Sequence, residues 1–375
     1  MNKKLFSIAD ARAAAKWRMP KIFFDYVDGA AGSEISCEQN CSMLDRMRLL
    51  PRVLVNVENR RLGKSLFGRE WDLPFGIAPM GMCNLTWPGA DKMLADAAVK
   101  YGMPVCLSTM ASSSIEYMRQ QAGENTWFQL YVGQSEEIGF DMVRRAEVAG
   151  YDTLILTVDV PMIAPRPREQ RNGFQSPIKI GPKQFFDFAT HPQWSIRTLL
   201  SGVPALANNM QNSSGEKFVR NESRGKVDWG FLERLRKRWK GKLIVKGVLS
   251  AQDAVRIRDA DVDAVYVSNH GGRQLDSAPA AIAMLPGIRA ALGDDYPIIF
   301  DSGVRNGEAV IKALALGADF VMLGRPFLYG IGAAGEQGLE AVIELLIKQI
   351  DTTLAQLARP DINDIDNSVI VSNDL

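Results

Sequence analysis

The 375-residue sequence is poor in features that several classes of protein need. It has only four cysteines, too few for the disulfide framework of a small secreted protein, and their spacing argues against a zinc site. No apolar run approaches the roughly 20 residues that cross a bilayer, and the first residues lack the apolar stretch of a secretory signal. We therefore expect a reduced, cytoplasmic protein without a bound metal.

An excess of charge of one sign is also lacking. The 44 Lys and Arg residues face 43 Asp and Glu residues, and this net charge of +1 argues against a broadly basic nucleic-acid-binding protein. Histidine is scarce, because His191 and His270 are the only two. Chemistry that needs a general base near neutral pH therefore has two imidazole candidates.

Eight short apolar runs recur along the chain, and a polar or glycine-rich turn and a helical segment follow most of them. They cover residues 75–79, 104–108, 127–131, 153–159, 243–247, 264–268, 298–302 and 319–323. Buried parallel strands have continuous apolar runs rather than alternating ones. Eight strand–helix units predict a (β/α)8 TIM barrel, an α/β fold, with residues 1–375 forming a single domain.

Three segments lie outside this repeat. We expect residues 7–60 to form a helical N-terminal extension and residues 336–357 to form a C-terminal helix. The interval between the fourth and fifth runs is longer than one helix needs, which predicts an insertion over 165–226. Within it, residues 177–226 have seven basic and three acidic residues, a net charge of +4, and five aromatic residues: Phe185, Phe186, Phe188, Trp194 and Phe218. Such a segment is typical of a lid or of a surface that docks on an anionic membrane.

Catalytic groups of barrel enzymes gather at the carboxyl ends of the strands. Here those ends have polar and glycine residues whose side chains or backbone can bind a ligand: Met80, Gly81, Ser108, Gln129, Tyr131, Thr157, Asp159, Lys246, Ser268, His270, Asp301 and Gly324 with Arg325. A base, a lysine, carboxylates, hydroxyls and an amide in one place indicate an active site.

Two loops and one strand end have the sharpest signals. His270 and Arg273, separated by two glycines, can supply a base and a clamp for a carboxylate, although a loop histidine and a surface arginine remain the alternative. Arg166 can act as a second clamp or lie in an exposed basic loop. Lys246 can form a Schiff base, hold an anion or take part in a structural ion pair.

The loops after the seventh and eighth runs are rich in glycine and arginine. Backbone NH groups at this place in a barrel commonly bind a phosphate. The residues concerned are Asp301, Gly303 and Arg305 in the first loop and Gly324 and Arg325 in the second.

These motifs together resemble the FMN-dependent α-hydroxy acid dehydrogenase/oxidase family. The matching stretches are MPKIFFDY, LPFGIAP, WFQLYV, LTVDVP, LIVKGVLSAQDA, VSNHGGRQLD, FDSGVRNG and KALALGADFVMLGRP. Within the family, the chain is most similar to the mandelate dehydrogenases and the membrane-associated flavin L-lactate dehydrogenases.

The resemblance implies roles for the residues that would bind and oxidise a substrate. His270 matches the active-site base, and Asp159 matches the carboxylate that pairs with it. Tyr26 and Tyr131 match the tyrosines beside the substrate carboxylate and hydroxyl. The two clamps on the substrate carboxylate correspond to Arg166 and Arg273, and Met110 stands where glycolate oxidase-like members have an active-site tryptophan.

The resemblance also implies an FMN cofactor. Lys246 matches the lysine beside the N1–C2=O edge of the flavin ring. Other ring contacts correspond to the side chains of Ser108, Gln129, Thr157 and Ser268 and to the backbone of Met80 and Gly81. The ribityl chain and phosphate correspond to Asp301, Gly303, Arg305, Gly324 and Arg325.

We therefore expect an enzyme that oxidises (S)-2-hydroxy acids to 2-oxo acids and passes the electrons to a quinone or another acceptor. The alternative within redox chemistry is an oxidase that reduces O2 to H2O2; Gly81 stands where many oxidases of the family have alanine. The resemblance further implies a homotetramer, cytoplasmic or peripheral on the cytoplasmic face of the inner membrane.

Overall fold

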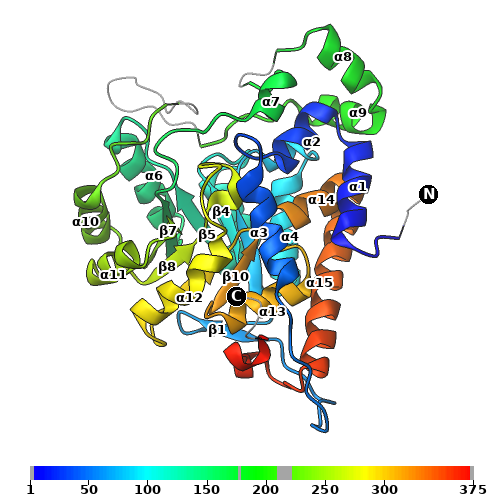
Figure 1. Cartoon of the computed structure of the whole chain (residues 1–375). Coiled ribbons are helices and arrows are strands. Elements are labelled where there is room, and N and C mark those ends of the chain that lie inside the picture. The colour runs from blue at the N-terminus through cyan, green and yellow to red at the C-terminus, as the bar shows by residue number, and fades with distance from the viewer. Residues whose placement is uncertain (1–3, 176–178, 209–221, 372–375) are drawn as a thin grey trace.

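The computed structural model describes residues 4–175, 179–208 and 222–371, and at its centre parallel strands form a closed barrel (Figure 1). The strands are β3 (Phe75–Met80), β4 (Val105–Ser108), β5 (Thr126–Leu130), β6 (Thr153–Thr157), β7 (Lys242–Val248), β8 (Ala264–Val267), β9 (Ile298–Phe300) and β10 (Phe320–Leu323). They pair in chain order, and β10 closes the barrel on β3. The predicted (β/α)8 fold is confirmed, and each predicted run overlaps one strand to within two residues at either end.

Helices cover the outside of the barrel. They are α4 (Ala90–Lys100), α5 (Ile115–Ala122), α6 (Glu136–Val148), α10 (Trp229–Arg238), α11 (Ala251–Asp259), α12 (Ala281–Leu292), α13 (Gly307–Ala315) and α14 (Arg325–Ala334). Several begin at a polar cap, because Ser114, Asp228, Ser250 and Asn306 each accept a backbone NH from the first turn. The caps fix where each helix starts and so determine the length of the loop that follows each strand.

The interior of the barrel is a separate apolar core that an antiparallel hairpin closes at the amino-terminal end. The hairpin consists of β1 (Lys64–Leu66) and β2 (Arg69–Trp71). Its Leu66 and Trp71 pack with interior residues such as Trp127 and Tyr266, and the Trp71 ring meets the Trp127 ring edge-on at 6.1 Å. The sequence did not predict this hairpin, because its two strands have only three residues each.

The N-terminal extension is helical only in part. Helices α1 (Ile8–Arg18), α2 (Lys21–Asp28) and α3 (Ile35–Arg46) confirm the expectation up to residue 46, but residues 47–63 contain no helix. Pro51 and the β-branched Val53, Val55 and Val57 disfavour helix there. Helix α1 packs along α14, and α3 contacts the turn that bears His270.

The insertion rises above the carboxyl ends of the strands (Figure 1). It contains α7 (Pro167–Arg171), α8 (Pro182–Ala189) and α9 (Pro192–Ser201), each of which begins with proline at its first position. The predicted C-terminal helix is α15 (Glu336–Gln356). Within the described ranges, no helix is both long and apolar enough to cross a membrane.

The aromatic residues of the insertion divide into two sets. Phe188 and Trp194 stack on Phe23 of α2, at 5.8 and 4.7 Å between ring centroids, so they anchor the insertion to the N-terminal extension. Phe185 and Phe186 are exposed. Of the five aromatic residues that the sequence pointed to in this segment, Phe185 and Phe186 are therefore available at the surface, and Phe218 lies outside the described residues.

Candidate active site

A cavity opens at the carboxyl ends of the strands and encloses about 1170 Å³, including its solvent-open mouth. The N-terminal extension, the strand ends and the insertion all contribute to its wall. The residues that the sequence singled out and that line it are Tyr26, Met80, Gly81, Ser108, Met110, Tyr131, Arg166, Lys246, His270, Arg273, Asp301, Gly303, Arg305, Gly324 and Arg325. Asp159, Ser268, Gln129 and Thr157 lie behind this wall, and the first three bond directly to residues that line it.

His270 lies in a short turn after β8 and is held at both ring nitrogens. Its Nδ1 is 3.0 and 3.2 Å from the two carboxylate oxygens of Asp159, and its Nε2 is 3.2 Å from the hydroxyl of Tyr131. A carboxylate at Nδ1 favours the tautomer with a proton on that nitrogen. Nε2 is thereby left as the proton acceptor at the cavity.

The two tyrosines of the cavity differ in their surroundings. Burial raises the pKa of Tyr131, and the charge of Asp159 adds to this, so the phenol stays protonated at neutral pH. The hydroxyl of Tyr26 donates to the carbonyl oxygen of Gly81 at 3.2 Å, and its ring stacks on Phe174 at 4.5 Å. Both hydroxyls are thus placed at the cavity as hydrogen-bonding groups.

The two arginines proposed as clamps lie together. Nε and Nη2 of Arg166 donate to the carbonyl oxygen of Arg273, at 3.3 and 3.2 Å. Nη2 of Arg273 donates to Glu169 at 2.7 Å, and the same carboxylate oxygen is 3.4 Å from Nη1 of Arg166. Two guanidinium groups that share one carboxylate leave an excess positive charge, which suits an anionic substrate group.

Glu169 was not predicted as a site residue. It is buried and comes three residues after Arg166 on α7. The only signal in the sequence was this helical spacing, which is also common on solvent-exposed helices.

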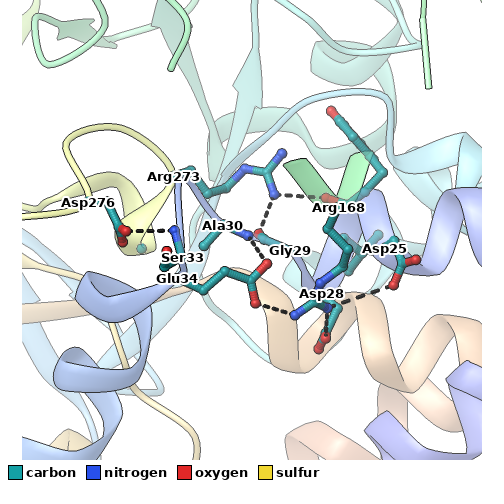
Figure 2. Close-up of polar contacts among 12 residues, drawn as sticks. Asp25, Asp28, Gly29, Ala30, Ser33, Glu34, Arg168, Arg273 and Asp276 are labelled. Carbon is teal, nitrogen blue, oxygen red and sulfur yellow. Dashed lines mark hydrogen bonds and ion pairs between the residues drawn. The ribbon is translucent and has the colours of Figure 1, made fainter. Parts of the chain in front are cut away.

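A layer of charged residues behind the arginines ties α7 to α2 (Figure 2). Arg168 of α7 forms ion pairs with Asp28, at 2.5 Å, and with Glu34. Asp28 also accepts from Arg12 and from the hydroxyl of Tyr329. Burial acts to raise the pKa of Asp28, but these hydrogen bonds and charges outweigh it and lower the pKa. The network holds α7, and with it Arg166 at its N-cap, against α2.

Lys246, at the end of β7, is buried in an ion pair. Its Nζ lies 2.5 Å from Oγ of Ser268 and 2.9 Å from the carboxylate of Asp301. Burial acts to raise the pKa of Asp301, but the charge of Lys246 and three hydrogen bonds outweigh it, so the pKa is lowered. A lysine held in this way can offset negative charge on a bound ring, whereas a Schiff base needs a neutral amine.

The two arginines of the loops predicted to bind a phosphate have different contacts. Arg325 donates to the backbone carbonyl oxygens of Val27, Gly29 and Gly271, at 2.9 to 3.1 Å, and so ties α2 to the turn of His270. Among the residues that the structure describes, Arg305 has one side-chain hydrogen bond, to the carbonyl oxygen of the preceding Val304. Gly303 has φ +90°, a conformation that L side chains rarely adopt.

Two buried polar groups test whether a flavin ring fits here. Within the described residues, Nε2 of Gln129 and Oγ1 of Thr157 have no hydrogen-bond partner, although both residues are buried at the ends of β5 and β6. Ser108 donates to Oε1 of Gln129 at 2.9 Å, which fixes the orientation of the amide. An unpaired buried polar group costs about 1–3 kcal/mol. The carbonyl oxygens and ring nitrogens of FMN would supply the missing partners.

Arg224 also lines the cavity. From the sequence it was only one of the seven basic residues of segment 177–226. It comes from the end of the insertion, is 5% exposed, and its guanidinium carbon lies 4.7 Å from the centroid of the Tyr131 ring. No motif in the sequence distinguished it from the other basic residues of the insertion.

Comparison with known proteins agrees with this geometry. Residues 15–372 match the family of FMN-dependent dehydrogenases. The (S)-mandelate dehydrogenase of Pseudomonas putida is 41% identical over 96% of this chain and 93% of its own length. An L-lactate dehydrogenase of Pseudomonas syringae pv. syringae (strain B728a) is 35% identical, over 97% of this chain and 98% of that protein.

Solved structures give the same result. A crystal structure described as the monotopic membrane protein (S)-mandelate dehydrogenase has a TM-score of 0.94 and 39% identity, covering 99% of this chain and 100% of that one. A mandelate oxidase structure with (S)-2-phenylpropionate has a TM-score of 0.81 and 32% identity, covering 96% of both chains. The resemblance inferred from the motifs is confirmed, and the chain belongs to the family of FMN-dependent dehydrogenases.

Proposed function

We propose that this enzyme uses FMN to oxidise (S)-2-hydroxy acids to 2-oxo acids. The observation that carries the proposal is the arrangement around His270. Its Nε2 faces the cavity beside Tyr131, its Nδ1 is held by Asp159, and the same cavity contains two arginines. The relatives named as mandelate and lactate dehydrogenases support this class of substrate.

Each residue has a distinct part in the proposed reaction. Arg166 and Arg273 bind the substrate carboxylate, and Tyr26 and Tyr131 hydrogen-bond to the substrate. His270 accepts a proton at Nε2, and Asp159 stabilises the imidazolium that forms.

Bound FMN supplies the acceptor of the two electrons. Gln129, Thr157 and Ser108 would hold its ring, and Lys246 would supply a cation that offsets negative charge on it. Arg305 and the backbone around Gly303 and Gly324 are available to its phosphate and ribityl chain.

We propose that the preferred substrates are bulky. Met110, Val160 and Ile163 line the cavity, and methionine is flexible enough to adapt to varied apolar groups. We expect a higher kcat/KM for mandelate or 2-hydroxy-4-methylpentanoate than for glycolate. A preference for glycolate would contradict this part of the proposal.

The deciding experiment is anaerobic mixing of the FMN-loaded protein with a panel of 2-hydroxy acids. The expected result is loss of the flavin absorbance and formation of the 2-oxo acid. Protein that stays colourless after FMN is added, or a flavin that no member of the panel bleaches, would disprove the proposal.

We further propose that the electrons pass to a quinone rather than to O2. Support comes from the likeness to a structure described as a monotopic membrane protein and from Gly81, which lines the cavity and stands where many oxidases of the family have alanine. Stopped-flow reoxidation should be fast with a quinone analogue and slow in air. H2O2 formed stoichiometrically at a rate matching kcat would instead identify an oxidase.

We propose that the insertion docks the enzyme on an anionic membrane surface, such as the cytoplasmic face of the inner membrane. Exposed apolar side chains follow one another on and around α8 and α9: Ile180, Phe185, Phe186, Ile196, Leu199, Leu200 and Val203. The exposed Lys179, Lys183 and Arg197 add positive charge to the same segment. These helices project from the carboxyl end of the barrel (Figure 1). Apolar side chains with basic residues beside them suit an interfacial helix.

The assembly that we propose is a homotetramer, as the family resemblance implies. The exposed Val53, Leu54 and Val55 in the non-helical arm offer an apolar contact for a second copy. Light scattering of the purified protein measures the mass, and a monomer would contradict the proposal.

A further inference from the structure

The position of Arg224 is fixed by contacts at both sides of the cavity mouth. Its backbone NH donates to the carbonyl oxygen of Pro161, 2.8 Å away in the loop after β6. The neighbouring Ser223 accepts, at 2.6 Å, from the side chain of Gln134 in the loop after β5. These bonds anchor the end of the insertion, so the guanidinium group is held at the cavity.

The side chain lies on Tyr131 rather than in solvent. Its guanidinium carbon is 4.7 Å from the centroid of that ring, and the residue is 5% exposed. Stacking on an aromatic face restricts the rotamers of arginine and keeps its planar fork of donors pre-organised. A buried, pre-organised guanidinium that lines a cavity is suited to bind an anion.

The position relative to the reacting atoms indicates which anion. The hydroxyl of Tyr131 is 3.2 Å from Nε2 of His270, and the ring of Tyr131 lies against Arg224. The C1 carboxylate is expected at Arg166 and Arg273, and the FMN phosphate at Arg305. Arg224 is therefore one tyrosine ring away from the base, and it is not among the arginines assigned to the C1 carboxylate or to the FMN phosphate.

We propose that Arg224 binds a second anionic group, carried on the side chain of the substrate. The preferred substrates are then 2-hydroxy acids with an acidic group, such as 2-hydroxydicarboxylic acids or mandelates with a carboxylate on the ring. This inference rests on the proposed function, because it assumes that a 2-hydroxy acid binds at His270. A carboxylate matches the bidentate fork of arginine.

The test compares matched pairs of substrates that differ in side-chain charge. One pair is (S)-2-hydroxyglutarate and (S)-2-hydroxyhexanoate, and the other is 4-carboxymandelate and mandelate. Anaerobic stopped-flow flavin reduction gives the rate and the apparent Kd for each. The variants are Arg224→Gln and, as a control, Arg197→Gln, an exposed arginine of the same insertion that lies on α9 outside the cavity.

The wild type should favour the anionic member of each pair by about tenfold or more, mainly through the apparent Kd. Arg224→Gln should lower this ratio by a similar factor, and Arg197→Gln should leave it unchanged. An equal loss for both members of a pair would mean that Arg224 only positions Tyr131 or binds the C1 carboxylate, and would overturn the proposal. A wild-type preference for the neutral members would also overturn it.

The two proposals fail in different ways in this experiment. Reduction by the neutral members alone leaves the proposed function standing and removes only the role of Arg224. If neither member of either pair bleaches the flavin, the proposed function fails, and the inference about Arg224 fails with it.

Discussion

His270 is held in a conformation that most residues avoid. Its φ is +60°, its backbone NH donates to Ser268 at 3.0 Å, and both ring nitrogens have a partner. A non-glycine residue in this region costs roughly 1–2 kcal/mol. The surrounding contacts fix the imidazole in a single orientation toward the cavity, as a general base requires.

We expect His270→Gln to retain FMN, since the cofactor wall is formed by other residues. Anaerobic flavin reduction by the best substrate should fall by more than the ~10²–10⁴ typical of losing a general base, because Tyr131 also loses its partner. The matched control is His191→Gln, which removes the other histidine, on the insertion, and should stay near the wild-type rate. A near-normal rate of flavin reduction in His270→Gln would show that His270 is not the general base.

Gly81 lies where an added methyl group would have no space. A Cβ there would be 2.9 Å from Cβ of Met110 and 3.5 Å from the hydroxyl of Tyr26. In Gly81→Ala, the new methyl group and Met110, which both line the cavity, must move apart. We expect this to reduce the room for a bulky side chain, so kcat/KM for mandelate should fall more than kcat/KM for glycolate. Gly287→Ala, a helical site with no atom within 4 Å of the new Cβ, is the control. A parallel fall for both substrates would show that the methyl group acts elsewhere.

At the scale of elements, α7 is the connection between the substrate arginines and the N-terminal extension. It has only five residues, and its position depends on the ion pairs of Arg168 with Asp28 and Glu34 (Figure 2). Arg168 is thus a positioning residue for Arg166, since the two are close neighbours on the same short helix.

The pKa of Asp28 predicts how this connection responds to pH. Its folded pKa is below the ordinary value of about 4, so the folded state binds fewer protons than the unfolded state. The stabilisation is therefore present above about pH 4 and is lost as the pH falls toward the folded pKa. At pH 7, Asp28→Asn should lower the free energy of unfolding by about 3–5 kcal/mol, the usual cost of breaking a buried pair.

Urea unfolding followed by circular dichroism at pH 7 and near pH 3 measures this difference. The gap between wild type and Asp28→Asn should shrink at the lower pH, whereas the exposed Asp294→Asn should match the wild type at both. A gap that stays constant with pH would show that the carboxylate charge of Asp28 does not contribute.

At the scale of the whole molecule, the eight strands were predictable because each is a continuous apolar run that ends at functional residues. The hairpin β1–β2 was not, because three-residue strands show no periodicity. Residues 47–60 were wrongly taken as helical because Pro51 and the β-branched valines that follow it were not weighed separately. Glu169 and Arg224 were missed because the insertion has no strand ends against which to locate them.

The same end of the molecule carries the cavity mouth and α8 with α9, so docking on a membrane would bring the mouth near the lipid. We expect the wild type to sediment with anionic vesicles at low salt and to be released at high salt, at ~1 kcal/mol per basic residue near the surface. A variant with Phe185, Phe186, Leu199 and Leu200 changed to serine should stay in the supernatant. Val148→Ser removes an equally exposed apolar side chain from α6 and is the control. If the wild-type protein stays in the supernatant at low salt, the insertion does not dock on membranes and the alternative, a lid over the active site, applies.

The hairpin below the barrel has a consequence for the order of events in turnover. Leu66 and Trp71 close the amino-terminal end of the barrel, and the cavity opens at the carboxyl ends of the strands. Small molecules are therefore expected to reach the flavin-binding residues from the carboxyl end. The hydroxy acid and the electron acceptor would then enter through the same cavity mouth and could not occupy the site at the same time. We therefore expect the oxo acid to leave before the acceptor binds, in which case initial rates at several fixed acceptor concentrations should give parallel double-reciprocal lines.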